Sequence, residues 1–281
     1  MTHSQGEPHI VSTRDGRHLH AQRREGPATA TAVFESGLAA NRSYWALVQQ
    51  HLAGPSIVYD RSGLGRSAPA TGPRRLRDLA EDLVDVIDAI PGEIVLVGHS
   101  WGGPITRLAA ARRRDRVVGL VLVDPSDEGC DLVFGRPARI AEAVGQIGSA
   151  ALARLGLLAT AYRSTLGALP EDARQDMRTE GFTVATTKTR KAELAAVVAD
   201  LRSLRETPPD LGGIGVTVIS GALNSAGMGA KVRAAVTEAH RASAARAGGR
   251  HVLAPNSGHM VPVTDPALVA DEVRRHFTRS L

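Results

Sequence analysis

Short runs of apolar residues recur along the chain, and most of them are followed by a longer stretch with helical periodicity. The apolar runs that we expect to form strands are 9–13, 17–22, 31–36, 56–60, 93–97, 117–124, 216–221 and 250–255. The first two flank the turn sequence RDG and predict an opening hairpin. Later strands alternate with amphipathic helices, as in residues 76–90, which predicts an eight-stranded, mostly parallel sheet with helices on both faces.

This alternation stops between residues 126 and 208, where no convincing strand pattern occurs. Aliphatic residues instead recur at helical spacing in two stripes. The stripes are Ile140, Val144, Ile147, Ala151, Leu155 and Leu158, followed by Leu194, Val197, Leu201 and Leu204. The sequence TPPDLGG at 207–213 suits a return to the sheet. We therefore expect a core domain of residues 1–125 and 209–281 and a helical lid of residues 126–208, inserted after the sixth strand over the ligand-binding edge.

Composition and charge narrow the function classes. The net charge is +5 in a chain of 281 residues, but aromatic residues make up only 3%, so few side chains could stack on bases. We therefore expect no nucleic-acid partner. No apolar stretch resembles a signal peptide or a membrane span, which predicts a cytoplasmic protein without membrane contact. The lone Cys130 and the absence of zinc-type spacing indicate neither a disulfide nor a metal site.

The heptapeptide VGHSWGG, residues 97–103, suggests chemistry, because a serine lies between glycines where a strand turns into a helix. Small residues two positions before and after Ser100 let the strand and helix approach closely, and the turn exposes the serine hydroxyl. The N-terminus of the following helix favours a negative charge nearby. Ser100 is therefore a candidate nucleophile.

Three further segments, together with this turn, resemble the α/β-hydrolase fold superfamily. They are VFESGLAANRSYW at 33–45, YDRSGLGRS at 59–67 and NSGHMVPVTDPALV at 256–269. The resemblance covers nearly the whole chain outside the lid, and it implies an oxyanion hole made by the backbone N–H groups of Leu38 and Trp101. Three residues near these motifs, Gly37, His99 and Trp45, are candidates for substrate contact, although strand alternation favours His99 packing behind the turn.

A general base and an acid complete the expected site. His259 follows the last strand in a flexible loop and can reach Ser100. The superfamily usually carries an aspartate after the strand at 216–221, but residues 211–237 contain neither Asp nor Glu. Some members carry the acid one strand earlier, which assigns it to Asp124. Asp127, Glu128 and the weaker Asn224 remain open as alternatives, while His240 is expected to be an ordinary helix histidine.

These residues predict a serine hydrolase that cleaves a small to medium apolar carboxylic ester or lactone through an acyl-serine intermediate, without a cofactor. Two other classes stay open. The same fold supports acyl transfer, cyclisation or carbon–carbon bond cleavage, and a ligand receptor with vestigial catalysis would explain Asn224. Serine at position 100 excludes the aspartate-nucleophile enzymes. The sequence does not predict an oligomeric state.

Overall fold

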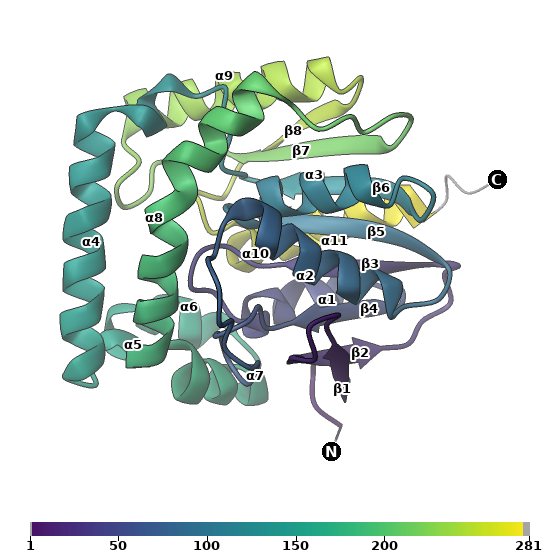
Figure 1. Ribbon diagram of the computed structural model, residues 1–281, viewed down its shortest axis with the longest axis horizontal. Coiled ribbons are helices and arrows are strands. Elements are labelled where there is room, and N and C mark those ends of the chain that lie inside the picture. The colour runs from purple at the N-terminus through teal and green to yellow at the C-terminus, as the bar shows by residue number, and fades with distance from the viewer. Residues whose placement is uncertain (1, 278–281) are drawn as a thin grey trace.

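A computed structural model of the chain describes residues 2–277 and contains one eight-stranded sheet (Figure 1). The strands are β1 (Glu7–Ser12), β2 (His18–Arg24), β3 (Ala30–Glu35), β4 (Ser56–Tyr59), β5 (Glu93–His99), β6 (Val117–Val123), β7 (Gly215–Gly221) and β8 (Arg250–Ala254). Their order is β1-β2-β4-β3-β5-β6-β7-β8. β2 pairs antiparallel with β1 and β4, and the other neighbouring strands are parallel. The predicted fold class is confirmed.

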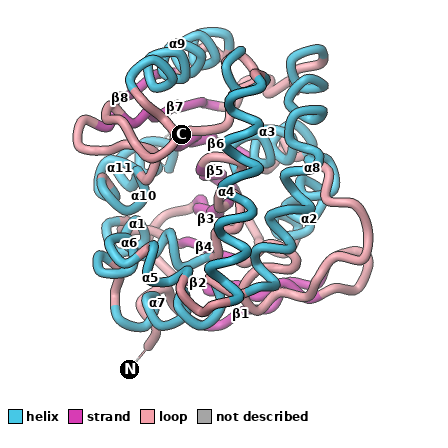
Figure 2. Tube along the Cα trace, turned by 90° about the vertical axis from the view of Figure 1, so that its left-hand side faces the viewer, coloured by secondary structure: helices cyan, strands magenta, loops and turns pink. Residues whose placement is uncertain are grey.

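Helices cover both faces of this sheet, as the view in Figure 2 shows. The helices that pack on the sheet are α1 (Ala46–His51), α2 (Leu76–Asp88), α3 (Gly102–Arg112), α9 (Ala230–Arg246), α10 (Val261–Thr264) and α11 (Pro266–Phe277). A short 3-10 helix, η1 (Arg42–Trp45), leads into α1. Residues of α2, α3 and α9 share one buried apolar cluster with side chains from one face of the sheet. Those of α1, α10 and α11 share a second cluster with the opposite face. Alternation of side chains along each strand supplies both clusters.

The segment between β6 and β7 is helical. Its helices are η2 (Asp131–Phe134), α4 (Arg136–Arg154), α5 (Leu158–Ala161), α6 (Arg163–Ala168), α7 (Glu171–Asp176), the π-helical turn η3 (Met177–Gly181) and α8 (Val184–Glu206). We call residues 126–208 the cap. α8 reaches the carboxyl edge of the sheet, where Thr189 Oγ1 donates to Gly63 O at 2.8 Å. α4 lies beside α8 and farther from the sheet (Figure 1).

The two aliphatic stripes of the cap differ in their surroundings. Val197, Leu201 and Leu204 of α8 are buried in the cluster that also contains α2 and α3. On α4, by contrast, Ile140 and Ile147 are 64% and 71% exposed. The periodicity of both stripes indicates helices. The α8 stripe packs against the core, whereas the first stripe faces solvent along α4 and becomes buried only at its last residue, Leu158 of α5.

Two groups of buried ion pairs join the cap to the core. Arg42 of η1 is fully buried, and its guanidinium binds Asp60 at 2.6 Å and the cap residues Asp176 and Glu180 at 2.5 and 2.6 Å. Arg61 and Glu193 form the second link. Because breaking a buried pair leaves a charge without compensation, separating the cap from the core would be costly at these two points.

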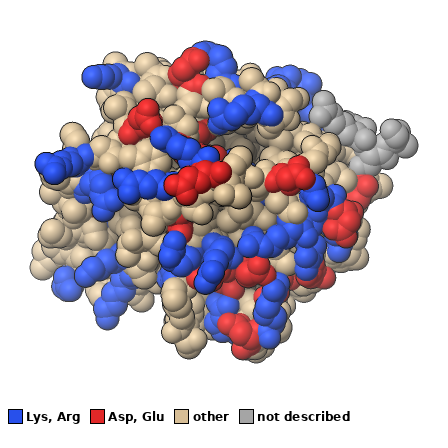
Figure 3. Space-filling view, turned by 45° about the horizontal axis from the view of Figure 1, so that its top comes forward, with Lys and Arg blue, Asp and Glu red and all other residues tan. Residues whose placement is uncertain are grey.

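The surface carries both signs of charge. On the face in Figure 3, Lys and Arg side chains outnumber Asp and Glu, and acidic groups lie among them. In the described part of the chain, none of the helices combines the length and the hydropathy of a membrane-spanning segment.

Candidate active site

Ser100 stands on a sharp turn between β5 and α3. Its backbone φ is 52°, in the left-handed region that side chains other than glycine rarely adopt. Glycine is required at positions 98 and 102 because backbone atoms of neighbouring segments come too close for a side chain. A Cβ at Gly98 would lie 2.6 Å from Gly102 O, and a Cβ at Gly102 would lie 2.4 Å from Glu35 O. The sequence pattern around Ser100 is therefore the steric requirement of this turn.

His259 and Asp124 meet Ser100 at the carboxyl edge of the sheet. His259 Nε2 lies 3.0 Å from Ser100 Oγ, and His259 Nδ1 lies 2.7 Å from Asp124 Oδ2. The carboxylate accepts, so Nδ1 carries the proton and Nε2 is free to accept from the serine hydroxyl. The structure thus brings together the three side chains that the sequence nominated, in a nucleophile–base–acid order.

The carboxylate of Asp124 has a second, charged partner that sequence reasoning missed. Arg233 of α9 donates from Nη1 to Oδ1 at 2.6 Å and from Nη2 to Oδ2 at 3.1 Å, and the backbone N–H of Gly221 donates to Oδ1 at 3.1 Å. Burial opposes ionisation of Asp124, but hydrogen bonds from His259 and Arg233 outweigh it and hold the pKa of this carboxyl well below its usual value. Asp124 is therefore ionised at neutral pH.

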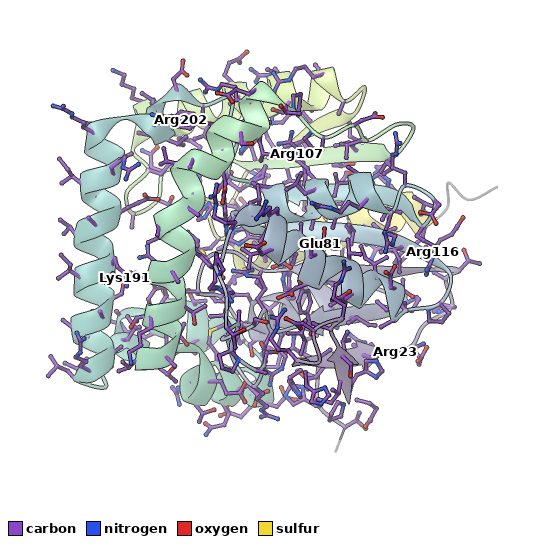
Figure 4. The ribbon with its side chains drawn as sticks, in the orientation of Figure 1. Arg23, Glu81, Arg107, Arg116, Lys191 and Arg202 are labelled. Atoms are coloured by element: carbon purple, nitrogen blue, oxygen red, sulfur yellow. The ribbon has the colours of Figure 1, made fainter. Side chains whose placement is uncertain are left out.

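The alternative acids lie elsewhere. Glu128 forms a two-point ion pair, at 2.7 and 2.8 Å, with Arg107 of α3, which is labelled in Figure 4. Asp127 Oδ1 accepts from the N–H of Gly129 at 2.7 Å. Asn224 lies exposed in the turn after β7. Of these candidates, Asp124 is the one that contacts His259.

The backbone around Leu38 passes close to the serine. A Cβ at Gly37 would lie 3.1 Å from Ser100 Cβ, and Ala39 has a φ of 59°. Within residues 2–277, the backbone N–H groups of Leu38 and Trp101 donate no hydrogen bond to protein. Their location beside Ser100 suits donors that stabilise an oxyanion.

His99, Trp45 and His240 are buried side chains. His99 Nε2 donates to His259 O at 2.9 Å, and burial with the neighbouring His259 lowers the pKa of His99 to about 3. The Trp45 side chain is fully buried and donates to Ser36 Oγ at 3.0 Å, so it packs in the core rather than lining a cavity. His240 is also fully buried and donates from Nε2 to Pro125 O at 2.8 Å, as expected of a helix histidine with satisfied hydrogen bonds.

A cavity of about 60 Å³ begins at Leu38 and Ala39 and extends under the cap. Aromatic and aliphatic side chains form much of its wall, with Tyr162 and Phe182 stacked at 5.2 Å between ring centroids. Other apolar lining residues are Tyr44, Leu158 and Met177.

Cys130 is buried away from this lining, and burial raises the pKa of its thiol. Within the described chain, no group of three or more His, Cys, Asp or Glu side chains could hold a metal ion.

Comparison with known proteins identifies the family. Residues 32–272 match the model of the alpha/beta hydrolase family. The uncharacterized protein YqjL of Bacillus subtilis is 32% identical over 124 residues, which are 42% of this chain and 48% of YqjL. The lipase LipV of Mycobacterium tuberculosis is 36% identical over 112 residues, 38% of this chain and 42% of the lipase. The matches thus span less than half the length of these relatives.

Solved structures agree on the fold. The Cif epoxide hydrolase from Acinetobacter nosocomialis superposes with a TM-score of 0.77 at 17% identity, covering 98% of this chain and 90% of that one. At this identity, the similarity concerns the architecture and not the reaction. The match to the family model extends from β3 to α11 and includes the cap, so the chain belongs to the alpha/beta hydrolase family.

Proposed function

We propose that the protein is a serine hydrolase that cleaves a small to medium apolar carboxylic ester or lactone through a covalent acyl-serine intermediate. The observation that carries this proposal is the contact chain from Ser100 through His259 to Asp124, with distances of 3.0 and 2.7 Å. Three side chains from three separate loops meet in the order needed to activate a hydroxyl group.

The proposed reaction proceeds in two halves. Ser100 Oγ attacks the carbonyl carbon while His259 Nε2 takes the hydroxyl proton, and Asp124 stabilises the imidazolium that forms. The N–H groups of Leu38 and Trp101 hold the oxyanion. The C–O bond to the alcohol then breaks, and His259 returns the proton to the leaving oxygen. Water attacks the acyl-serine in the same way, which releases the carboxylic acid and restores Ser100.

The cavity beside Leu38 supports a small apolar acyl group as the preferred substrate portion. About 60 Å³ is room for roughly four to six water-sized groups, since each needs about 10–15 Å³ by this measure. Aromatic rings at Tyr44, Tyr162 and Phe182 favour apolar groups, while Arg190 and polar side chains in the same lining offer a few hydrogen-bonding groups that could orient the substrate. The aliphatic stripes of α4 and α8 add nothing to this argument about the substrate, because the α4 stripe faces solvent and the α8 stripe packs on the core.

Asn224 was the only feature of the sequence that favoured a receptor with vestigial catalysis. That residue is exposed, whereas Asp124, at the end of the preceding strand, lies 2.7 Å from His259 Nδ1. The contacts of Asp124 therefore favour catalysis over a purely binding role.

Labelling with a small fluorophosphonate tests the proposal directly. We expect the wild type to gain one adduct by intact mass and to turn over short p-nitrophenyl esters, and Ser100→Ala to do neither. The matched control is Ser126→Ala, since the backbone N–H of Ser126 donates to Ser100 O at 2.9 Å while its hydroxyl makes no contact with His259. An unlabelled wild type, or an adduct that persists in Ser100→Ala, would refute the assignment.

A further inference from the structure

The Arg61 guanidinium lies at the centre of a buried cluster beside residues 36–38, which we call the oxyanion turn. It is 1% exposed, and all five of its N–H groups donate to protein. Nη1 donates to Glu35 and to Ser36 O, Nη2 donates to Gly37 O at 2.8 Å, and Nε and Nη2 donate to the two carboxylate oxygens of Glu193 at 3.3 and 3.0 Å. A guanidinium with every donor used has one orientation available to it.

This orientation controls the direction of an oxyanion donor. The carbonyl of Gly37 and the N–H of Leu38 belong to the same peptide unit, which is planar and trans, so the two groups point in opposite directions. By holding Gly37 O on one side, Arg61 directs Leu38 N–H to the other side. Ser100 borders this turn, since a Cβ at Gly37 would lie 3.1 Å from Ser100 Cβ.

The cap supplies the remaining side of the cluster. Glu193 lies on α8, is fully buried, and accepts from Arg74 Nη2 at 2.6 Å as well as from Arg61. Glu193 is thus the carboxylate that both arginines share, and its charge compensates two buried cations. Removing the Glu193 charge leaves a buried cation with two N–H groups lacking a strong acceptor. The guanidinium can then turn toward Glu35 and release Gly37 O.

We infer that Glu193 is a positioning residue for catalysis, through which the cap holds Arg61 and thereby aims the oxyanion donor of Leu38. The inference rests on the proposed function and adds a role for the cap. Residues 132 positions apart in the chain act on one peptide unit, so the oxyanion hole is complete only while α8 is docked on the core.

Asp200 provides a matched comparison on the same helix. It is also buried, accepts from Arg75 Nε and Nη2 at 2.8 and 2.6 Å, and accepts from the backbone N–H of Leu76 at 2.8 Å. Arg75 makes no contact with residues 36–38 among the described hydrogen bonds. Asp200→Asn therefore removes the charge from another buried carboxylate of α8 but leaves the contacts of Glu193 with Arg61, and of Arg61 with Gly37, in place.

Steady-state kinetics of Glu193→Gln and Asp200→Asn on a short p-nitrophenyl ester test the inference, with thermal unfolding to measure the folded fraction. Loss of one complete oxyanion donor costs about 10² to 10³ in rate, so we expect a misaimed donor in Glu193→Gln to lower kcat by about tenfold to a hundredfold. KM should change by less than about threefold, because the interaction is made in the transition state. Asp200→Asn should keep kcat within about twofold of the wild type.

The outcomes separate this inference from the proposed function. Equal kcat losses in the two variants after correction for folded protein, or a raised KM with unchanged kcat in Glu193→Gln, would overturn it and leave the serine mechanism intact. A wild type without turnover and without an adduct removes the proposed function and this inference together. If Glu193→Gln does not fold, Glu193→Asp serves instead: it keeps the charge, but its shorter side chain withdraws the carboxylate from Nε and Nη2 of Arg61. We then expect kcat to fall in the same direction, and an unchanged kcat in that variant would overturn the inference.

Discussion

Replacement of Asp124 by asparagine should affect catalysis and stability by separate routes. In the wild type, Oδ1 accepts from Arg233 Nη1 and from Gly221 N–H, and Oδ2 accepts from His259 at 2.7 Å and from Arg233 Nη2 at 3.1 Å. Because Arg233 and Gly221 can only donate, the amide oxygen of the substituted side chain must take the place of Oδ1, and its NH₂ group then faces His259 Nδ1. The histidine is forced to carry its proton on Nε2, where it can no longer accept from Ser100.

The size of both effects follows from these contacts. The wrong tautomer costs about 10⁴ in kcat in a serine-protease triad, or about 5.4 kcal/mol at 1.36 kcal/mol per factor of ten. Arg233 is only 4% exposed, and leaving such a cation unpaired costs about 3–5 kcal/mol of folding free energy. At about 2–4 °C per kcal/mol for a domain of 150–250 residues, the melting temperature should fall by about 6–20 °C.

A double variant separates the two routes. In Asp124→Asn with Arg233→Met, the unpaired cation is gone, so we expect at least half of the lost thermal stability to return while kcat stays as low as in the single variant. Ester turnover and thermal unfolding measure the two effects, with Asp127→Asn as the control that leaves His259 untouched. Retention of more than about a tenth of the wild-type kcat in Asp124→Asn would refute the assignment of the acid. A double variant no more stable than the single one would refute the ion-pair argument.

Two further predictions use other features of the site. Ester chain length should matter: kcat/KM for p-nitrophenyl esters should be highest for acyl groups of about two to four carbons and fall for about eight, and a rising series would contradict the small cavity beside Leu38. The pH dependence of unfolding should include His99, whose pKa is lowered to about 3 in the fold. The unfolded chain binds a proton there below about pH 6.5 and the folded chain does not, so this residue removes stability as pH falls from 6.5 toward 3, by up to about 1.4 kcal/mol per pH unit. Denaturant titrations should therefore give a shallower loss in His99→Gln, and identical pH slopes would disprove the burial argument.

Local pattern was enough to predict the sheet and the central side chains. Ser100 and His259 lie in short motifs whose strand, turn and helix context is recognisable in the sequence. Asp124 came from the resemblance to the α/β-hydrolase superfamily, some members of which carry the acid one strand earlier. The eight strands were confirmed. The contacts among these three side chains are those the sequence led us to expect.

The supporting residues were not predictable in the same way. Arg233 reaches Asp124 from a helix 109 positions away, and Glu193 reaches Arg61 across 132 positions, so no local spacing reveals either pair. The sequence offered one hint about Arg233: residues 211–237 contain no Asp or Glu, so its ion-pair partner had to come from a distant segment. Trp45 was nominated because it ends a family-like motif, but its indole is buried in the core. Periodicity showed that α4 is a helix but could not show that its aliphatic side faces solvent.

Three residues at the carboxyl edge of the sheet share a backbone conformation that costs free energy. Ala39, Ser100 and Asp124 have φ values of 59°, 52° and 41°, and each lies at the proposed site. A side chain held in this region costs about 1–3 kcal/mol, which is a substantial part of the roughly 5–15 kcal/mol by which folded domains are stable. Glycine in place of Ser100 would relieve this cost and abolish the nucleophile. The same turn that exposes the serine therefore sets activity against stability, and selection for thermal stability alone would favour inactive proteins.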